Sequence, residues 1–207
     1  MSDKYVYSIT QENPETIYIN LTNKCTNNCV FCIRQSEHAI KGDDLWLSSE
    51  NVTFDMVKEQ LIPFTNAKEA VFCGYGEPTI KLDLLKEVAN YLKSKYAGIK
   101  IRINTNGQGN LINNKNIIPE LVGLVDELSV SLNASTNKDY MTISGCKNPK
   151  AYESVKDFIK KSVQNNIPTT ATVVIGYKNY EVDVEECEKF VNQVGAKFRV
   201  RQWLKGY

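Results

Sequence analysis

The sequence predicts an α/β protein with the form of an open, partial (β/α)6 barrel, in which outer helices cover a parallel sheet. Six strand-like segments alternate with helical segments, and this alternation implies parallel βαβ units with right-handed crossovers. Six units are too few for a closed eight-stranded barrel. The length of 207 residues suits one domain, so residues 1–207 are expected to form a single core domain. A flat, doubly wound sheet is the alternative.

The first half of the chain supplies three of the six units. Short apolar segments rich in β-branched residues predict the strands, and apolar residues at helical spacing predict the helices. A further short strand within KYVYSI is expected to cover a sheet edge. The expected strands lie at 16–21, 69–73 and 100–104, and the expected helices at about 53–63, 82–92 and 117–122.

The second half repeats the pattern, with expected strands at 126–132, 169–175 and 197–203 and helical faces at 151–159 and 187–194. The connection after the fourth strand is longer than those after the second and third strands. The polar, irregular stretch from Cys32 to Asn51 is also long for a connection. Long loops in compact domains are commonly functional.

Charge and hydropathy exclude two broad classes of protein. The net charge is +1, so the chain lacks the positive surface of a phosphate-tracking protein, and nucleic acid is an unlikely main partner. No window reaches about 18 consecutive apolar residues, and the first residues do not resemble a secretory signal. A soluble, cytoplasmic protein is expected, and six cysteines fit a reducing compartment.

The segment CTNNCVFC places three thiols, Cys25, Cys29 and Cys32, at the spacing Cx3Cx2C directly after the first strand. One short loop can direct all three sulfurs into the same hollow with little loss of chain entropy. A structural zinc ion normally takes four protein ligands, whereas a four-iron cluster held by three cysteines leaves one iron free. A zinc site completed by His38 and a structural disulfide are the alternatives.

Three further motifs lie where strands end, which is where ligands bind in parallel α/β folds. In GYGEP, Gly74 and Gly76 permit close approach of a ligand and Glu77 offers a carboxylate to an ammonium group, although a plain turn explains the glycines equally. Asn106 lies in NTNG, which reads as a turn or as a contact near the ligand. Ser131 and Asn133 end the fourth strand as polar residues directed to the barrel mouth or to solvent.

The last two strands and the remaining cysteines leave alternatives open. Ile175 and Gly176 could pack an adenine ring or belong to the core. Arg199 and Arg201 have the same side-chain parity, so both point into the barrel toward anionic partners or both point to solvent. The cysteines outside the loop divide into two kinds: Cys73 and Cys187 are expected in the core, whereas Cys146, in a polar loop, is an ordinary thiol or one that serves the substrate at the mouth.

The cysteine segment, with Phe31 as the aromatic residue before the third cysteine, resembles the Cx3CxφC signature of the radical S-adenosylmethionine (radical SAM) enzymes. GYGEP is similar to their GGEP motif, with Tyr75 where the family usually has glycine, and TNG segments follow the third strand in many of them. The resemblance implies a partial barrel. It also implies that the backbone and glutamate of GYGEP meet the amino group of S-adenosylmethionine (SAM).

The same resemblance implies the chemistry. The three cysteines would hold three irons of a [4Fe-4S] cluster and SAM the fourth. One electron from a flavodoxin- or ferredoxin-type donor would cleave SAM to a 5'-deoxyadenosyl radical that abstracts hydrogen from a substrate. The expected catalytic and metal-binding residues are Cys25, Cys29 and Cys32; the expected cofactor contacts are Phe31, Gly74, Tyr75, Gly76, Glu77, Asn106, Ser131, Asn133, Ile175 and Arg201.

Within the superfamily, NLTNKCTNNCVFCIR and the short length most resemble the small TatD-associated radical SAM proteins. A glycyl-radical-enzyme activase is an alternative, but it typically carries Asp-x-Lys where this chain has SVSLN, and Ser or Asn cannot replace a lysine charge. A deazaguanine-forming radical SAM enzyme is another. Outside catalysis, an iron-sulfur electron-transfer or sensor module is possible. The substrate cannot be read, although a peptide or protein would suit an open barrel.

Overall fold

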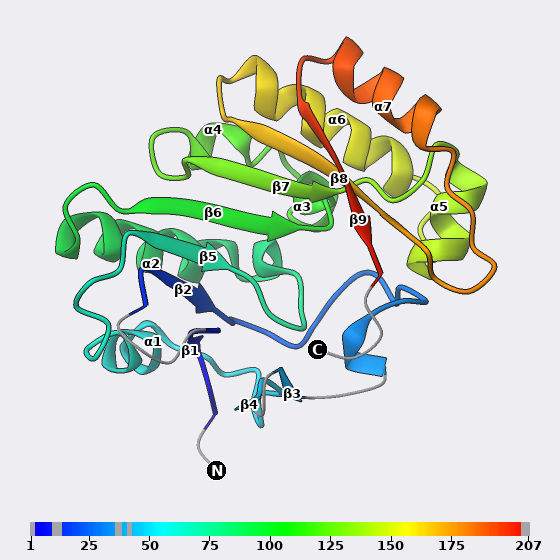
Figure 1. The fold of residues 1–207 in the computed structure, drawn as a ribbon. Coiled ribbons are helices and arrows are strands. Elements are labelled where there is room, and N and C mark those ends of the chain that lie inside the picture. Colours follow the sequence, from blue (N-terminus) through cyan, green and yellow to red (C-terminus); the bar gives the residue numbers. More distant parts are fainter. Residues whose placement is uncertain (1–2, 10–13, 36–38, 41–42, 204–207) are drawn as a thin grey trace.

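The computed structural model describes residues 3–9, 14–35, 39–40 and 43–203. Its main sheet has seven strands in the order β1-β2-β5-β6-β7-β8-β9 (Figure 1). Only β1 runs antiparallel to its neighbour; the other pairs are parallel. The strands are β1 Val6–Tyr7, β2 Thr16–Ile19, β5 Glu69–Phe72, β6 Lys100–Thr105, β7 Glu127–Ser131, β8 Thr169–Ile175 and β9 Lys197–Gln202.

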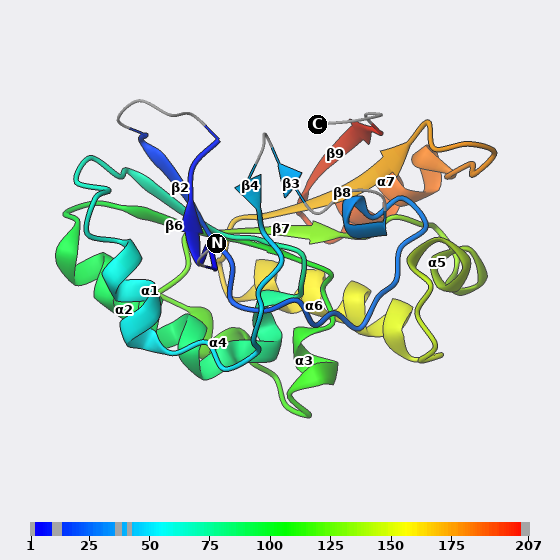
Figure 2. The same ribbon diagram turned by 90° about the horizontal axis from the view of Figure 1, so that it is seen from below.

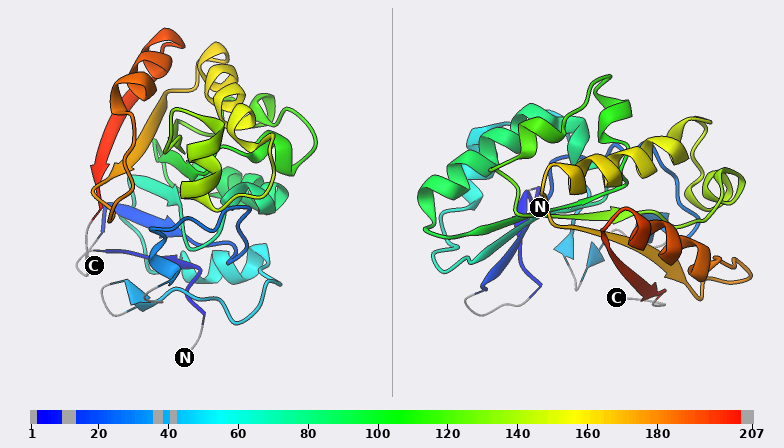
Figure 3. Two further views of the ribbon diagram at one scale, coloured as in Figure 1. Left: turned by 90° about the vertical axis from the view of Figure 1, so that its right-hand side faces the viewer. Right: turned by 90° about the horizontal axis from the view of Figure 1, so that it is seen from above.

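The predicted fold class is confirmed. Six parallel strands follow one another across the sheet in chain order, and β1, from the KYVYSI segment, covers the edge of β2. The sheet is open and curves toward β9 (Figure 3), which separates it from a flat doubly wound sheet. The long stretch after the cysteines contains η1 Ile33–Gln35 and a small hairpin of β3 Ala39–Ile40 and β4 Asp43–Asp44.

The larger helices pack on one side of the sheet, and the β3–β4 hairpin lies on the other (Figure 2). Two α-helices were not predicted: α3 follows β6, and α5 lies in the long connection after β7. The helices are α1 Phe54–Gln60, η2 Pro78–Lys81, α2 Leu82–Lys95, α3 Gly109–Ile112, α4 Ile118–Leu121, α5 Asn137–Ser144, α6 Ala151–Gln164 and α7 Val184–Gln193.

The main core lies between the sheet and these helices. Because successive side chains of a strand point to opposite faces, every second strand residue reaches this core. The buried residues include Ile17, Ile19, Ala70, Phe72, Ile101, Ile103, Leu128, Val130, Ala171 and Val173 from strands, and Leu85, Val88, Val155 and Phe158 from α2 and α6. A smaller apolar cluster of Tyr7, Leu45 and Tyr75 lies apart from it.

The other strand residues share the face turned away from this core, which we call the inner face. Near β1 and β2 it is covered by the small apolar cluster, against which Tyr18 packs. From β6 onward the inner face is mostly polar. By strand alternation and register, its residues there are Lys100, Arg102, Asn104, Glu127, Ser129, Ser131, Thr170, Thr172, Val174, Lys197, Arg199 and Arg201.

Candidate active site

The cysteine loop, residues 23–32, follows β2 at the carboxyl edge of the sheet. All three of its thiols are half-buried. The loop ends in a turn in which the Cys32 N–H donates to the Cys29 carbonyl oxygen at 3.0 Å. Burial raises the pKa of Cys29 to about 12, and the neighbouring thiols of Cys32 and Cys25 contribute to that rise. The three sulfurs therefore lie close enough to interact, and without a metal the Cys29 thiol stays protonated.

The thiols do not converge on a single point. In the described part of the chain, no three His, Cys, Asp or Glu side chains meet at the spacing of one metal ion. A four-iron cluster is wider than a single ion, so it holds its thiolates farther apart. His38, which the zinc alternative requires, lies outside the described residues.

Glu77 joins the ends of two strands beneath the loop. Its Oε1 accepts hydrogen bonds from Thr79 N (3.1 Å), Thr79 Oγ1 (2.7 Å) and Thr105 Oγ1 (2.7 Å), and its Oε2 accepts one from Asn106 N (2.6 Å). Its own N–H donates to Lys24 O at 2.8 Å. Burial raises the pKa of Glu77, and these four donors lower it in part. The carboxylate is thus already bound by the protein, so its contact with a ligand amine stays a prediction.

The two glycines of GYGEP let the chain approach itself. A Cβ on Gly76 would lie 2.3 Å from Thr22 O and 2.5 Å from Lys24 O, and a Cβ on Gly74 would lie 2.1 Å from Asn20 Oδ1. No real side chain tolerates contacts this short. The turn therefore carries glycine because the segment 20–24, which follows β2 and leads into the cysteine loop, lies directly against it. The sequence did not reveal this reason.

Asn106, at the end of β6, supports the cysteine loop from the other side. Its Nδ2 donates to Thr26 Oγ1 (2.8 Å) and lies 3.7 Å from Cys25 Sγ, while its Oδ1 accepts from Gln108 N (2.9 Å). Burial raises the pKa of Cys25, and the Asn106 amide is one of the groups that lower it. Asn106 therefore supports the cysteine loop, and its contact with SAM stays a prediction.

A buried polar network, formed by Asn27, Gln108, Tyr140 and Cys146, lies under the loop. Gln108 Nε2 donates to Asn27 Oδ1 (2.7 Å) and Tyr140 Oη (2.9 Å), and Asn27 Nδ2 donates to the same hydroxyl (3.2 Å). Burial raises the pKa of Tyr140 to about 12, so the phenol is neutral. Cys146 Sγ is 3.8 Å from Gln108 Nε2. Cys146 is buried in this network, which contradicts a place for it at the barrel mouth.

Helix α5 ends against the cysteine loop. Asn28 N donates to Ser144 O (2.7 Å) and Val30 N donates to Ile143 O (3.0 Å). Gly145 follows with φ +59°, and a Cβ there would lie 2.5 Å from Asn28 O. The sequence held a signal for this helix, because Thr136 caps it by accepting from Asp139 N at 3.2 Å.

The segment 45–50 is attached to the outer side of the loop. Asn23 Nδ2 donates to Leu47 O at 2.7 Å, and Leu47 N donates to Asn23 Oδ1 at 3.1 Å. Thr22 Oγ1 donates to Glu50 Oε2 at 2.6 Å. Arg34 Nη1 donates to Asn23 O at 2.9 Å. Between loop and segment is a hollow of about 760 Å³ lined by Asn23, Lys24, Cys25, Asn28, Arg34 and residues 46–50. Small-ligand sites occupy roughly 300–1,000 Å³.

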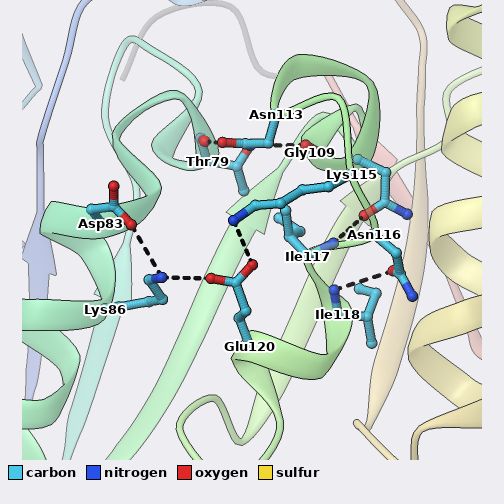
Figure 4. Close-up of polar contacts among 11 residues, drawn as sticks. Thr79, Asp83, Lys86, Gly109, Asn113, Lys115, Asn116, Ile117, Ile118 and Glu120 are labelled. Carbon is cyan, nitrogen blue, oxygen red and sulfur yellow. Dashed lines mark hydrogen bonds and ion pairs between the residues drawn. The ribbon is translucent and has the colours of Figure 1, made fainter.

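A second set of polar contacts supports the Glu77 turn from the helix side (Figure 4). Asn113 Nδ2 donates to Thr79 O (3.0 Å) and Gly109 O (2.9 Å), which ties η2 to α3. Below it, Glu120 pairs with Lys86 (2.5 Å) and Lys115 (2.7 Å). The Asn113 contacts therefore join the helix that follows Glu77 to the helix that follows Gln108.

Asn133 is the clearest free ligand group among the predicted contacts. It is 3% exposed, it adopts φ +61°, and its Oδ1 is buried without a hydrogen-bond partner among the described residues. A buried acceptor without a donor costs free energy, so this atom needs a partner, which a bound water or a ligand can supply. Ser131 is half-buried on the inner face beside it.

The other predicted contacts differ in their surroundings. The ring of Phe31 packs edge-on against that of Tyr177, with 6.2 Å between the ring centroids, and Tyr177 packs edge-on against Trp203 with a centroid distance of 5.0 Å. Aromatic rings therefore connect the cysteine loop to the ends of β8 and β9. Tyr75 is buried in the small apolar cluster, so its ring serves packing. Ile175 is half-buried and packs partly on the main core. Arg201 is exposed on β9.

One of the two cysteines expected in the core is elsewhere. Cys187 is 2% exposed within the main core, as predicted. Cys73 follows β5 on the inner face, where it is half-buried beside the amide of Asn104. The prediction for Cys73 was wrong because an apolar segment of this length does not reveal which strand face a residue occupies.

A family model described as the Radical SAM superfamily matches residues 19–191. The chain belongs to the radical SAM superfamily. Members of this superfamily are enzymes that bind a [4Fe-4S] cluster and SAM, and they require an electron donor. The comparison leaves the TatD-associated subgroup unresolved.

Two curated relatives are similar to this radical SAM protein. It is 25% identical over 192 residues to an S-adenosylmethionine-dependent nucleotide dehydratase of Selenomonas ruminantium, covering 90% of this chain and 63% of the relative. It is 27% identical over 158 residues to an uncharacterised protein of Methanocaldococcus jannaschii, covering 75% of this chain and 44% of the relative. The chain therefore spans less than two thirds of either relative.

Solved structures share the fold at low identity. Streptococcus suis SuiB bound to its precursor peptide SuiA matches with TM-score 0.66 and 19% identity, covering 92% of this chain and 40% of SuiB. A radical SAM methyltransferase from Sphaerobacter thermophilus matches with TM-score 0.59 and 14% identity, covering 90% of this chain and 66% of the other. In the described part of this chain, no helix is long and apolar enough to cross a membrane.

The residues present fit the two cofactors of the superfamily. Three thiols carried by one short loop suit a cluster with one open iron. The hollow beside Cys25 has the volume of a small-ligand site, and Asn133 Oδ1 offers an unused acceptor at the same edge of the sheet. Cys25, Cys29 and Cys32 would hold the cluster, and the ends of β5, β6 and β7 would hold SAM.

Proposed function

We propose that this protein is a radical SAM enzyme in which Cys25, Cys29 and Cys32 ligate a [4Fe-4S] cluster. The supporting observation is the cysteine loop itself, whose three thiols are held at the carboxyl edge of the sheet by Asn106 and the buried network. When bound and reduced, the cluster and SAM together supply a 5'-deoxyadenosyl radical that takes hydrogen from a substrate.

The chain's own residues position these groups. Glu77 fixes the turn after β5 and the start of the cysteine loop, and we expect it to receive the amino group of SAM through the remaining lone pair of Oε2. Asn133 Oδ1 accepts a hydrogen bond from a hydroxyl of SAM, with Ser131 beside it. Phe31 and its aromatic neighbours keep water from the cysteines. The backbones of Gly74, Tyr75 and Gly76 and the side chain of Ile175 are further proposed cofactor contacts.

Several finer statements belong to the same proposal. The chain is a single radical SAM core domain over residues 1–207, most like the TatD-associated subgroup by its cysteine segment. A flavodoxin or ferredoxin supplies the electron in the cytoplasm. The substrate is unidentified. No observation favours the activase or deazaguanine alternatives over this reading.

The test is anaerobic reconstitution with iron and sulfide. Wild-type protein should bind about four irons, and Cys25→Ala, Cys29→Ala and Cys32→Ala should each abolish the cluster. Cys187→Ala is the matched control, because this thiol is buried in the main core. Iron content and the electron paramagnetic resonance (EPR) spectrum of the reduced protein are the measurements.

Two outcomes would contradict the proposal. Stoichiometric zinc without iron in protein purified without air would favour the zinc site. A reduced cluster whose EPR spectrum does not change when SAM is added would favour an electron-transfer or sensor module, because such modules commonly ligate every iron with protein.

A further inference from the structure

Arginine is rare in this chain and unevenly placed. Only four of the 25 basic residues are arginine. Arg34 donates to backbone carbonyls of the cysteine loop. The other three, Arg102, Arg199 and Arg201, lie on the inner face of the sheet, whereas the α-helices carry only lysine as basic residues.

Contacts place these side chains on the inner face. Arg102 Nε and Nη1 donate to Glu69 Oε1 and Asn104 Oδ1, both at 3.1 Å. Arg199 Nη2 lies 3.4 Å from Ser129 Oγ, so it reaches across β8 to the inner face of β7. Arg201 is two residues farther along β9 and therefore points to the same side.

The charges at the two ends of this face differ. Arg102 is neutralised by Glu69. Among the described residues, Arg199 and Arg201 have no acidic partner within ion-pair distance. The strand carboxylates that share the inner face, Glu69 and Glu127, are the first residues of β5 and β7, so they lie at the amino edge. Two uncompensated positive charges thus remain toward the carboxyl edge, where the cysteine loop lies.

The choice of arginine carries chemical information. An edge strand that only needs charge is served equally by lysine. The guanidinium group instead matches phosphate and carboxylate with two parallel hydrogen bonds. Side chains two residues apart on a strand are separated by roughly 7 Å, so the pair can contact one anionic group from two sides or two linked groups.

We propose that Arg199 and Arg201 bind an anionic group of the substrate, a phosphate or a carboxylate, on the inner face of the sheet. This inference rests on the proposed function, since it assigns the substrate class of the same site. It gives Arg201 to the substrate instead of the cofactor. The aromatic ring of Trp203, two residues after Arg201, adds an apolar surface to one end of the site.

The test uses reconstituted holoenzyme with SAM bound. Inorganic pyrophosphate and succinate are titrated separately by calorimetry into wild type, into Arg199→Gln/Arg201→Gln, and into Lys160→Gln/Lys189→Gln. The control removes the same two charges from exposed positions of α6 and α7. SAM binding is followed in all three proteins by the EPR signal of the reduced cluster.

We expect one probe to bind wild type and control alike, and the arginine variant to bind it about a hundredfold more weakly, about tenfold for each arginine. Preference for pyrophosphate assigns a phosphate, and preference for succinate assigns a carboxylate. SAM binding and iron content should be equal in all three proteins.

Three results would overturn the inference: no binding of either probe to wild type, equal binding by the arginine variant, or loss of SAM binding in that variant. The last would mean that the arginines hold the carboxylate of SAM. None of these results removes the cluster or the SAM response of the wild type, so failure here is distinguishable from failure of the proposed function.

Discussion

Two regions at the same sheet differ in how far their polar groups are bonded within the protein. One is the turn that contains Glu77, and the other is the strand that contains Arg199 and Arg201. Glu77 is 2% exposed and accepts four hydrogen bonds from the protein. On β9 both arginines are exposed, and the hydrogen bond from Arg199 to Ser129 is long, at 3.4 Å. One region is complete without a ligand, and the other leaves its charges unmatched.

This difference suggests a division of labour. A cofactor that is always the same is best served by rigid groups that need no rearrangement when it binds. The Glu77 turn, Asn106 and the buried network have that character. An exposed strand with few internal contacts can adapt to a ligand at little cost to the fold. Substitutions in the first region should therefore change stability, and those in the second should change binding alone.

The largest effect is expected for Gly76→Ala, which tests how tightly the first region is packed. The new Cβ would lie 2.3 Å from Thr22 O, a backbone atom that cannot move without displacing the cysteine loop. We expect the free energy of unfolding of the metal-free protein to fall by about 3 kcal/mol in a urea titration.

Gly98→Ala is the matched control. Gly98 differs from Gly76 in having a left-handed backbone, with φ +74°, and a Cβ added there would have no atom within 4 Å. Its cost should be about 1 kcal/mol, from backbone strain alone. Equal losses in the two variants would mean that the contact with the cysteine loop is not tight.

Glu77→Gln tests whether the four hydrogen bonds hold the turn. Glutamine keeps the shape but replaces one acceptor oxygen with an NH₂ group, which then faces N–H or O–H donors. We expect the free energy of unfolding to fall by about 2 kcal/mol, and affinity for SAM to fall at least about tenfold. Glu87→Gln, exposed on α2, should behave as wild type. A variant that lost SAM affinity without losing stability would show that Glu77 serves mainly the ligand.

Tyr140→Phe tests the buried network under the cysteines. Removing the hydroxyl leaves the amides of Gln108 and Asn27 without one shared acceptor. We expect a loss of about 1.5 kcal/mol in the free energy of unfolding and faster release of iron from reconstituted protein to a chelator. Tyr91→Phe is the control, since the Tyr91 hydroxyl makes no hydrogen bond within the described chain. Equal rates of iron release from the two variants would mean that the buried network does not support the cysteine loop.

The sequence predicted the parts of this molecule that repeat or that have a fixed spacing. Alternating strands and helices predicted six parallel strands, and the antiparallel cover strand followed from one short apolar segment. The cysteine spacing and the polar ends of strands placed Glu77, Asn106 and Asn133 at one edge of the sheet, which the structure shows. Local patterns were sufficient because strand order here follows chain order.

Contacts between distant segments could not be predicted in this way. Gln108, Asn27 and Tyr140 meet across separations of 32 to 113 residues, and nothing in the local sequence of any one of them names the others. Helix α5 was missed although its Thr136 cap was visible. The face of the sheet occupied by Cys73 depends on register, which a short apolar strand does not determine.

The smallest effects are expected for substitutions of Cys187 and Cys73, which lie outside the polar contacts of both regions. These substitutions test which face of the sheet belongs to the core. Cys187→Ala removes a sulfur from the main core and should lower the free energy of unfolding by about 1 kcal/mol. Cys73→Ala acts on the half-buried inner face and should cost about half as much.

In native protein, iodoacetamide should label Cys73 faster than Cys187, because of the two only Cys73 faces the open side of the sheet. Mass spectrometry of the separate peptides measures the two rates. Burial raises the pKa of both thiols. A difference between their labelling rates would therefore report how easily the reagent reaches each thiol, and not thiolate content alone. Slower labelling of Cys73 would mean that the inner face is closed at β5, and the arginine site would then have to lie entirely between β7 and β9.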